Sequence, residues 1–521
     1  MSKSGLFGVV VVLLVILAFV SLYIAGDQNG SETRKDIVKD KKNGQNDHVV
    51  TLPASTPKPM LDGWEKPALA ILLTGEQRGS LEPCGCSDKQ SGGISRRADL
   101  LRQITEKDWP LTALDLGGAV KRNRLQSQLK FQTLLAALGD MHYAAVALGP
   151  QELRFGADYL YSQQSEDGPP FLCANVVFDD FADLGIPAQT KLVTVGDLKI
   201  GVTAILGTSF KDKVLITGNL RISIQEPAKA LPDAIEQLKQ QKPDLMVLLS
   251  HANADESRKL ANDFPEFDVI LSAGGPEDPS GTPEQVGKSV LVHVGHKGKY
   301  VGVLGYYPDK PAQRLRFELV ELDKERFENA LEIVQRMQDY QEQLKDQQLA
   351  GTGPAITHPS GARFVGVEKC AECHTKAYAI WKDTPHAHAF ESLKDDTRPG
   401  RANFGTRAFD AECLSCHVTG WHPQQVLRYE SGFINKEFAT TEADQALSRL
   451  LKGQQCENCH GPGSRHVELV DRDDLPAARK EVRVTLAEAK NNLCISCHDY
   501  DNSPEYDWDI YWPLVEHKGL D

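Results

Sequence analysis

The chain has 521 residues and a formal net charge of −14 at pH 7, with 72 acidic against 58 basic side chains. This length exceeds what one hydrophobic core usually supports, so it predicts two domains. A surplus of acidic side chains repels phosphate backbones, so the charge argues against nucleic acid as a partner.

The first segment of the chain is strongly apolar. Residues Leu6 to Ile24 contain no charged side chain, and a helix of this length can cross a bilayer. No convincing small-residue cleavage site follows, and a secretory signal usually has a shorter apolar run, so residues 1–26 are predicted to be an uncleaved anchor. An uncleaved anchor and a secretory signal both place the rest of the chain outside the cytoplasm. We therefore expect a single-pass protein of the cell inner membrane, with its bulk in the periplasm or at the cell exterior.

The region after the anchor divides into a tether and an α/β domain. Residues 27–65 are polar and rich in turn-formers, which predicts a flexible tether. Over residues 66–322, short apolar runs such as "ALAILLT" and "DLMVLLSH" alternate with helical patterns such as "ISRRADLLRQITEK". This alternation predicts layered α/β structure, with loops at the carboxyl ends of strands as the usual place for a site.

A charged amphipathic stretch begins at residue 323 and is followed by a linker that reaches residue 360. The apolar residues Phe327, Leu331, Val334 and Met337 fall close to one helical face. We expect a connecting helix here, exposed to solvent as a spacer.

Four pentapeptides of the form Cys-x-x-Cys-His stand in the predicted second domain, residues 361–521: "CAECH", "CLSCH", "CENCH" and "CISCH". The motif is typical of c-type haem attachment. Its two thiols can reach both vinyl groups of one haem, and the adjacent histidine then faces the iron. Zinc ribbons and iron–sulfur clusters both leave those histidines unexplained. The sequence therefore predicts a mainly α domain with four covalently attached haem c groups.

The motifs assign most of the haem site directly. The predicted attachment thiols are Cys370, Cys373, Cys413, Cys416, Cys456, Cys459, Cys494 and Cys497. The predicted proximal iron ligands are His374, His417, His460 and His498. Six more histidines lie nearby, of which His358 and His422 are interpreted as surface residues. A second histidine on an iron suits electron transfer, whereas an open position permits ligand binding or catalysis.

The flanks of these motifs, such as "CAECHTKAYAIWKDTPHAHAF" and "CENCHGPGSRHV", carry a family resemblance. The last 155 or so residues resemble the tetrahaem cytochromes that accept electrons from hydroxylamine oxidoreductase in ammonia oxidisers. In that family most haems have two histidine ligands and one can remain five-coordinate. The resemblance implies His386, His466 and His517 as distal ligands, with His388 as the substitute for the first.

The α/β region resembles the metallophosphatase domain of bacterial 5′-nucleotidases and UDP-sugar hydrolases. The segments "ILLTGEQRGSLEP", "SGGISRRADLL", "LDLGGAV", "VALGPQELRF", "LLSHAN" and "ILSAGGPEDP" follow in that family's order. The resemblance implies an αββα sandwich and a two-metal site. Only His251 keeps the ligand type that the family has at its position. The other ligand positions hold Glu76, Arg78, Gly118, Pro150, Gln151, Gly274 and Pro276. Two-metal hydrolysis needs carboxylates and imidazoles around both ions, so we expect that phosphatase chemistry is lost.

Three cysteines lie outside the haem motifs. Cys173 stands in the apolar run "FLCANVVF" and is predicted to be a buried core residue. Cys84 and Cys86 stand in the loop expected to rim the former phosphatase site. A Cys-x-Cys disulfide closes a small strained ring, and strained disulfides are the reducible ones. A redox pair, a structural disulfide and a metal-binding or inert role all remain open.

The whole chain resembles a nucleotidase-like protein family, fused to such a cytochrome, in which selenocysteine can occupy the loop of Cys84 and Cys86. The first functional hypothesis is a membrane-anchored electron carrier between redox protein donors and acceptors. The alternative is a redox enzyme that reduces a small molecule at a five-coordinate haem or at the dithiol. A metal-dependent nucleotidase is the least supported hypothesis. No oligomeric state follows from the sequence.

Overall fold

The computed structural model of the chain describes residues 59–83, 90–165, 168–179, 184–215, 220–394 and 403–517. All of these described residues belong to one compact unit. Within the described ranges, no helix combines the length and the apolar character needed to cross a bilayer. The predicted anchor, residues 1–26, and most of the predicted tether lie outside those ranges.

The first sheet of the α/β region has six strands in the order β14-β13-β1-β2-β3-β4. The strands are β1 (Leu69–Thr74), β2 (Leu111–Asp115), β3 (Ala145–Ala147), β4 (Phe171–Leu172), β13 (Tyr300–Tyr306) and β14 (Leu315–Glu321). Strands β1 to β4 run parallel, so their carboxyl ends share one edge of the sheet. Every residue of β1, "LAILLT", is buried, as expected for a strand covered on both faces.

The second sheet also has six strands, in the order β11-β12-β10-β9-β7-β6. The strands are β6 (Thr190–Val195), β7 (Leu198–Leu206), β9 (Leu245–Asn253), β10 (Val269–Gly274), β11 (Glu284–Val286) and β12 (Ser289–Val292). Its four central strands are parallel, and β6 and β11 pair antiparallel at the two edges.

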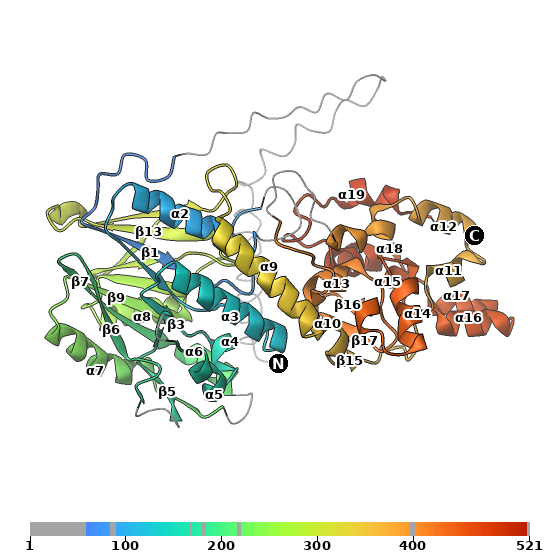
Figure 1. Cartoon of the computed structure of the whole chain (residues 1–521), viewed down its shortest axis with the longest axis horizontal. Helices are drawn as coiled ribbons and strands as arrows, with labels where there is room; N and C mark the ends of the chain where they lie inside the picture. The colour runs from blue at the N-terminus through green and yellow to red at the C-terminus, as the bar shows by residue number, and fades with distance from the viewer. Residues whose placement is uncertain are drawn as a thin grey trace, which may run out of the picture. The chain divides into compact units, whose positions relative to one another are not determined.

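The two sheets pack face to face, and helices cover both outer faces (Figure 1). Leu73 and Leu114 of the first sheet share an apolar core with Val247 and Leu271 of the second. Helices α2 (Ile94–Glu106) and α3 (Leu125–Asp140) pack on the first sheet, and α7 (Pro227–Gln240) and α8 (Ala254–Asp263) pack on the second. The predicted αββα sandwich is confirmed.

The predicted connecting helix is α9 (Leu331–Asp346), and the expectation of a solvent-exposed spacer was wrong. Helix α9 lies beside α2 and α3 (Figure 1). Phe327, Val334 and Met337 are buried in the same core as those two helices, whereas Leu331 is 81% exposed. The apolar stripe is therefore covered by neighbouring helices, and Leu331 lies on the other side of α9.

The end of the predicted tether is packed as well. Leu61 is 5% exposed, and the ring of Trp64 stacks on that of Trp109 with centroids 6.3 Å apart. The guanidinium of Arg316 lies 4.7 Å from the centroid of the Trp64 ring. These apolar and cation–π contacts place the start of the packed domain at Leu61 rather than at residue 66.

The C-terminal part is mainly helical, as predicted. Its principal helices are α11 (Val367–Ala371), α12 (Thr375–Trp381), α13 (Ala411–His417), α14 (Glu442–Leu450), α15 (Cys456–His460), α16 (Ser464–Asp471) and α17 (Leu475–Glu481). A small sheet joins β15 (Ala355–Ile356), β17 (Leu427–Tyr429) and β16 (Trp421–His422). Strand β15 lies in the stretch assigned to the linker and pairs with β17, so this stretch is structured.

Candidate functional site

The Cys-x-x-Cys-His segments adopt helical turns, and this gives the motif its geometry. In the first, the backbone N–H groups of Cys373 and His374 both donate to the carbonyl of Cys370, at 3.2 and 2.9 Å. In the last, Cys497 and His498 donate to the carbonyl of Cys494, at 3.3 and 2.8 Å. Residues three and four positions apart lie on one helical face, so the two thiols and the histidine of a motif point the same way.

Three of the motif histidines face a second histidine. The ring centroids are 6.2 Å apart for His374 and His466, and 5.8 Å apart for His460 and His517. The rings of His498 and His386 are 6.0 Å apart. Two imidazole nitrogens that each lie about 2 Å from a shared metal place their ring centroids about 6 Å apart. The spacing therefore fits an iron between each pair.

Hydrogen bonds at Nδ1 to backbone carbonyls orient three of these six rings. The Nδ1 atoms of His460, His466 and His517 lie 2.8, 2.8 and 2.9 Å from the carbonyl oxygens of Val482, Ala478 and Val515. A ring that donates its Nδ1–H to a carbonyl leaves Nε2 available as a metal ligand. The residues therefore fit haem iron in donor type and tautomer as well as in spacing.

The remaining motif histidine is His417 of the second motif, which ends helix α13. Its Nδ1 lies 2.7 Å from the carbonyl oxygen of Ala389 and 3.2 Å from the hydroxyl of Ser392. A backbone carbonyl thus orients the ring of His417 as well, which fits the role of a proximal iron ligand.

The remaining histidines of this region differ in environment. His388, the sequence-based substitute for His386, is exposed. The ring of His358 packs on Tyr429 with centroids 4.8 Å apart, and its Nδ1 lies 2.8 Å from the Ser360 hydroxyl. The ring of His422 lies 6.4 Å from that of Tyr429. The structure therefore pairs His386, and not His388, with a motif histidine.

Thiols of different motifs are neighbours. A hydrogen bond with Cys456 raises the pKa of Cys370, and one with Cys497 raises the pKa of Cys416. Burial raises the pKa of Cys459 to about 11, and the nearby Cys494 adds to this effect. The first attachment segment is thus adjacent to the third. The fourth segment is adjacent to both the second and the third.

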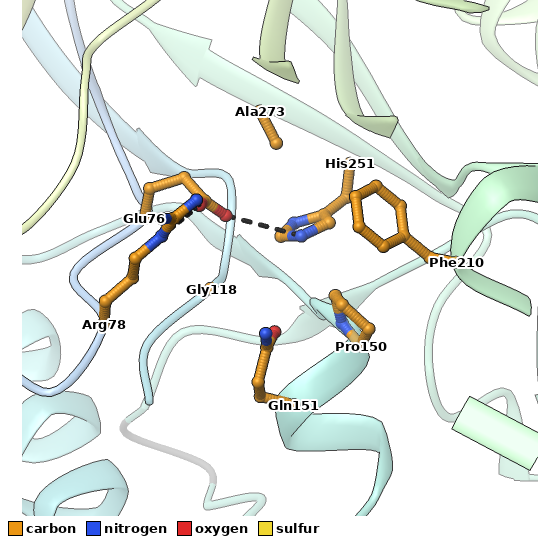
Figure 2. Close-up of a pocket in the computed structure, with 8 residues that line it drawn as sticks. All are labelled: Glu76, Arg78, Gly118, Pro150, Gln151, Phe210, His251 and Ala273. Carbon is orange, nitrogen blue, oxygen red and sulfur yellow. Dashed lines mark hydrogen bonds and ion pairs between the residues drawn. The ribbon is translucent and has the colours of Figure 1, made fainter. Parts of the chain in front are cut away.

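Six of the eight residues at the former metal positions line one cavity at the carboxyl edges of the two sheets, whereas Gly274 and Pro276 are not part of its lining (Figure 2). The cavity is lined by Glu76, Arg78, Gly118, Pro150, Gln151, Phe210, His251 and Ala273. Arg78 donates from Nε and Nη2 to one carboxylate oxygen of Glu76, at 2.8 and 2.6 Å. The other oxygen lies 3.4 Å from Nε2 of His251. Nη2 of Arg78 also lies 3.0 Å from Nε2 of His296.

Burial dominates the electrostatics of this cavity. It raises the pKa of Glu76 to about 7, although the guanidinium of Arg78 opposes the change. Burial lowers the pKa of His251, and the nearby Glu152 carboxylate opposes this. Within the described residues, no three His, Cys, Asp or Glu side chains gather so as to hold a metal ion. The cavity can instead hold protons, because Glu76 titrates near neutral pH.

Glu152 is a site residue that the sequence reasoning missed. Its side chain is fully buried and accepts hydrogen bonds from the backbone N–H groups of Gly118, Val120 and Gly149, at 3.2, 3.1 and 2.8 Å. The signal was available, because "GPQE" keeps the final glutamate of the family's Gly-Asn-His-Glu segment. Glu152 thus ties together two of the loops that form the cavity.

The three cysteines outside the motifs have different outcomes. Cys173 is fully buried, as predicted, and burial raises the pKa of its thiol to about 12. Cys84 and Cys86 lie outside the described residues, so their role stays a prediction.

The fold and the histidine pairs define a two-part protein, in which a metallophosphatase-like α/β sandwich precedes a helical domain whose histidine pairs fit the irons of c-type haem. The family described as "Cytochrome c554 and c-prime" matches residues 369–461. Residues 369–461 are thus similar to cytochromes c554, and the layers of the α/β region are similar to those of 5′-nucleotidases.

Individual relatives match each part separately. Cytochrome c-554 of Nitrosomonas europaea is 32% identical over 159 residues, which cover 27% of this chain and 61% of that protein. The apyrase of Aedes aegypti is 26% identical over 268 residues, covering 45% of this chain and 46% of the apyrase. The crystal structure of a 5′-nucleotidase precursor from Thermus thermophilus is 19% identical with a TM-score of 0.46, covering 56% of this chain and 60% of that one. The chain therefore spans less than two thirds of each of these relatives.

Proposed function

We propose that the protein is an exported, membrane-anchored tetrahaem cytochrome c that carries electrons between redox partner proteins. The observation that carries this proposal is the set of three histidine pairs, because each joins a motif histidine to a second imidazole at about 6 Å. Two axial imidazoles favour low-spin iron, which is suited to electron transfer. The predicted N-terminal anchor would hold the protein at the outer face of the inner membrane.

Each haem would be held by two cysteines and oriented by histidines of the chain. The proposed iron-ligand pairs are His374 with His466, His460 with His517, and His498 with His386, while His417 is the proximal ligand of the remaining haem. When bound, haem supplies a one-electron couple between ferric and ferrous iron. The carbonyls of Val482, Ala478 and Val515 fix the ring tautomers that this ligation requires.

The adjacency of the attachment segments supports a route for electrons within the domain. Cys370 contacts Cys456, Cys459 lies near Cys494, and Cys416 contacts Cys497. Electrons would pass along the four sites in the order first, third, fourth and second. The two ends of this route are the natural places for a donor and an acceptor to dock.

We further propose that the α/β domain has lost two-metal hydrolysis. Arg78 places a guanidinium against Glu76 in the cavity, where its positive charge disfavours a cation. The test is phosphate release from AMP and ATP with added magnesium, manganese or zinc, with an active apyrase as the positive control. We expect no release above the no-enzyme blank. Metal-dependent release that a purified Glu76→Gln variant lacks would contradict this part of the proposal.

A second candidate function is thiol redox chemistry at Cys84 and Cys86. The observation that favours it is the ion pair between Glu82, two residues before Cys84, and Arg407, six residues before the haem-binding Cys413. Oxidation of the dithiol to a disulfide would release two electrons and two protons, and the electrons would reduce two ferric haems. Thiol counting on protein poised at a series of potentials tests this step. A thiol count that never changes eliminates it.

The electron-carrier proposal is tested by the visible spectrum of the reduced protein before and after addition of carbon monoxide. Haems with two histidine ligands leave no position for carbon monoxide, so we expect at least three of the four haems to keep their Soret absorption. The reduced protein should also reduce a soluble c-type cytochrome. A Soret shift that involves most of the haem would contradict the proposed ligation and favour an enzyme.

A further inference from the structure

Helix α13, which carries the second haem motif, contacts the α/β domain through the residue before its first cysteine. Glu412 accepts hydrogen bonds from Arg122 at 3.1 Å and from Lys130 at 2.6 Å, one at each carboxylate oxygen. Lys130 also donates to the backbone carbonyl of Gly79, at 2.8 Å. The α/β domain therefore presents two cations to the segment that holds one haem.

These contacts are largely removed from solvent. The side chain of Lys130 is 10% exposed and that of Arg122 is 22% exposed, while Glu412 is 34% exposed. Burial alone would lower the pKa of Lys130, but the carboxylates of Glu412 and Asp410 outweigh it and raise that pKa. Burial alone would raise the pKa of Glu412, but Lys130 and Arg122 lower it. Lys130 and Glu412 are thus charged at neutral pH, and solvent screens the pair weakly.

Further charged groups lie around this contact. Arg124 donates to the backbone carbonyls of Gln425 and Val426, at 2.7 and 2.9 Å, and so adds a positive charge beside the haem domain. Asp410 is 5% exposed and accepts a hydrogen bond from Gln126. Glu82 and Arg407 pair with each other. We call Arg122, Arg124 and Lys130 the basic edge. It supplies the cations that offset Asp410 and Glu412, the two acids of the haem segment.

We propose that the basic edge sets the reduction potential of the haem attached at Cys413 and Cys416. A ferrous haem carries one more electron than a ferric haem, so a nearby positive charge stabilises the reduced form. No bond forms or breaks in this step, and the electron comes from the redox partner. The inference rests on the proposed electron-carrier function, and it gives the α/β domain a role in that function through Lys130 and Arg122 as positioning residues.

The test is a potentiometric titration of the full-length, haem-loaded protein and its Lys130→Met variant. At a fixed potential, we expect the reduced-to-oxidised ratio of one haem to fall roughly three- to ten-fold in the variant. A ten-fold change in a one-electron couple corresponds to about 59 mV. The matched control is Lys310→Met, because Lys310 pairs with Glu65 inside the α/β domain. This control should leave every haem unchanged.

Further variants separate a charge effect from a loss of structure. Glu412→Gln should shift the same haem in the opposite direction, Lys130→Arg should keep the wild-type titration, and the double Lys130→Met, Glu412→Gln variant should return toward it. Unchanged titrations in both single variants would overturn the inference, and so would an equal shift of all four haems. A protein that lacks haem or exchanges no electrons instead refutes the proposed function, and its spectrum reveals that failure separately.

Discussion

Lys297 of the α/β domain donates to both carboxylate oxygens of Asp501, at 2.7 and 2.5 Å. Asp501 lies three residues after His498, a candidate iron ligand. The backbone N–H of Lys297 also donates to the carbonyl of Glu76, at 2.7 Å. One residue therefore joins the cavity of the metallophosphatase-like domain to the fourth haem segment.

This relationship predicts the effect of an Asp501→Asn substitution. Both partners are partly buried, so the loss of the ion pair should destabilise the contact by about 1–2 kcal/mol. Backbone amides of residues 494–501 should then exchange with deuterium roughly 5–30 times faster. Hydrogen-exchange mass spectrometry measures this change. The exposed Asp509→Asn variant is the control, and equal exchange in wild type and Asp501→Asn would refute the prediction.

The ligand assignment predicts different results at two neighbouring histidines. His386→Ala should remove the second ligand of one iron, because the ring of His386 faces His498. One haem more than in the wild type should then bind carbon monoxide and lose its low-spin signal in electron paramagnetic resonance. His388→Ala should leave the signals unchanged, since His388 is exposed. An effect of His388→Ala with none from His386→Ala would reverse the assignment.

The helical turns of the Cys-x-x-Cys-His segments could be predicted from sequence, because the motif needs its thiols and its histidine on one face, as the backbone hydrogen bond from His374 to Cys370 illustrates. The αββα layers could be predicted because alternating apolar strands and amphipathic helices have few ways to bury both kinds of face. The packing of Trp64 and of helix α9 could not be predicted from the sequence. Both lie in polar stretches of the chain, and their contacts with Trp109 and with α3 are made by residues far away in sequence.

The pairing of sites depends on residues far apart in the chain. His386 meets His498, and Lys130 meets Glu412, only through the fold, so neither partner could be read from local sequence. The candidate ligands themselves could be named, because histidines beside the motifs are few. Their roles as ligands stay predictions until the haem-loaded protein is measured.

The cavity predicts a pH dependence of stability. Glu76 has a folded pKa of about 7, above its ordinary value of 4.5, because it is buried. Protonated Glu76 therefore stabilises the folded state. This stabilisation is complete below pH 4.5 and is lost as the pH rises through 7. In Glu76→Gln, the melting temperature should fall less between these two pH values than in wild type. Circular dichroism measures the difference.

The control for this measurement is Glu106→Gln, which removes a carboxylate that is 60% exposed. It should show the wild-type dependence on pH. If Glu76→Gln also keeps that dependence, the carboxyl group of Glu76 ionises in the folded protein much as it does in water.

Gly118 predicts a cost for restoring a side chain at one of the former metal-ligand positions. Its φ is +73°, a region that other residues rarely adopt, and an added Cβ would collide with the Glu76 carboxylate. Gly118→Ala should therefore destabilise the α/β domain by about 2–4 kcal/mol, measured by urea unfolding. At Gly196, φ is +59° and an added Cβ meets nothing within 4 Å. The Gly196→Ala variant therefore measures the cost of the positive φ alone, without a collision. Equal losses in the two variants would contradict the predicted collision.

The central claim is that four haems are covalently attached at the four Cys-x-x-Cys-His motifs. The most direct measurement is the intact mass of the denatured protein, produced in a host that matures c-type cytochromes. The account predicts a mass that exceeds the polypeptide by four haems, and a loss of one haem in a Cys494→Ala, Cys497→Ala double variant. A colourless protein, or a mass with no covalent adduct, would contradict it.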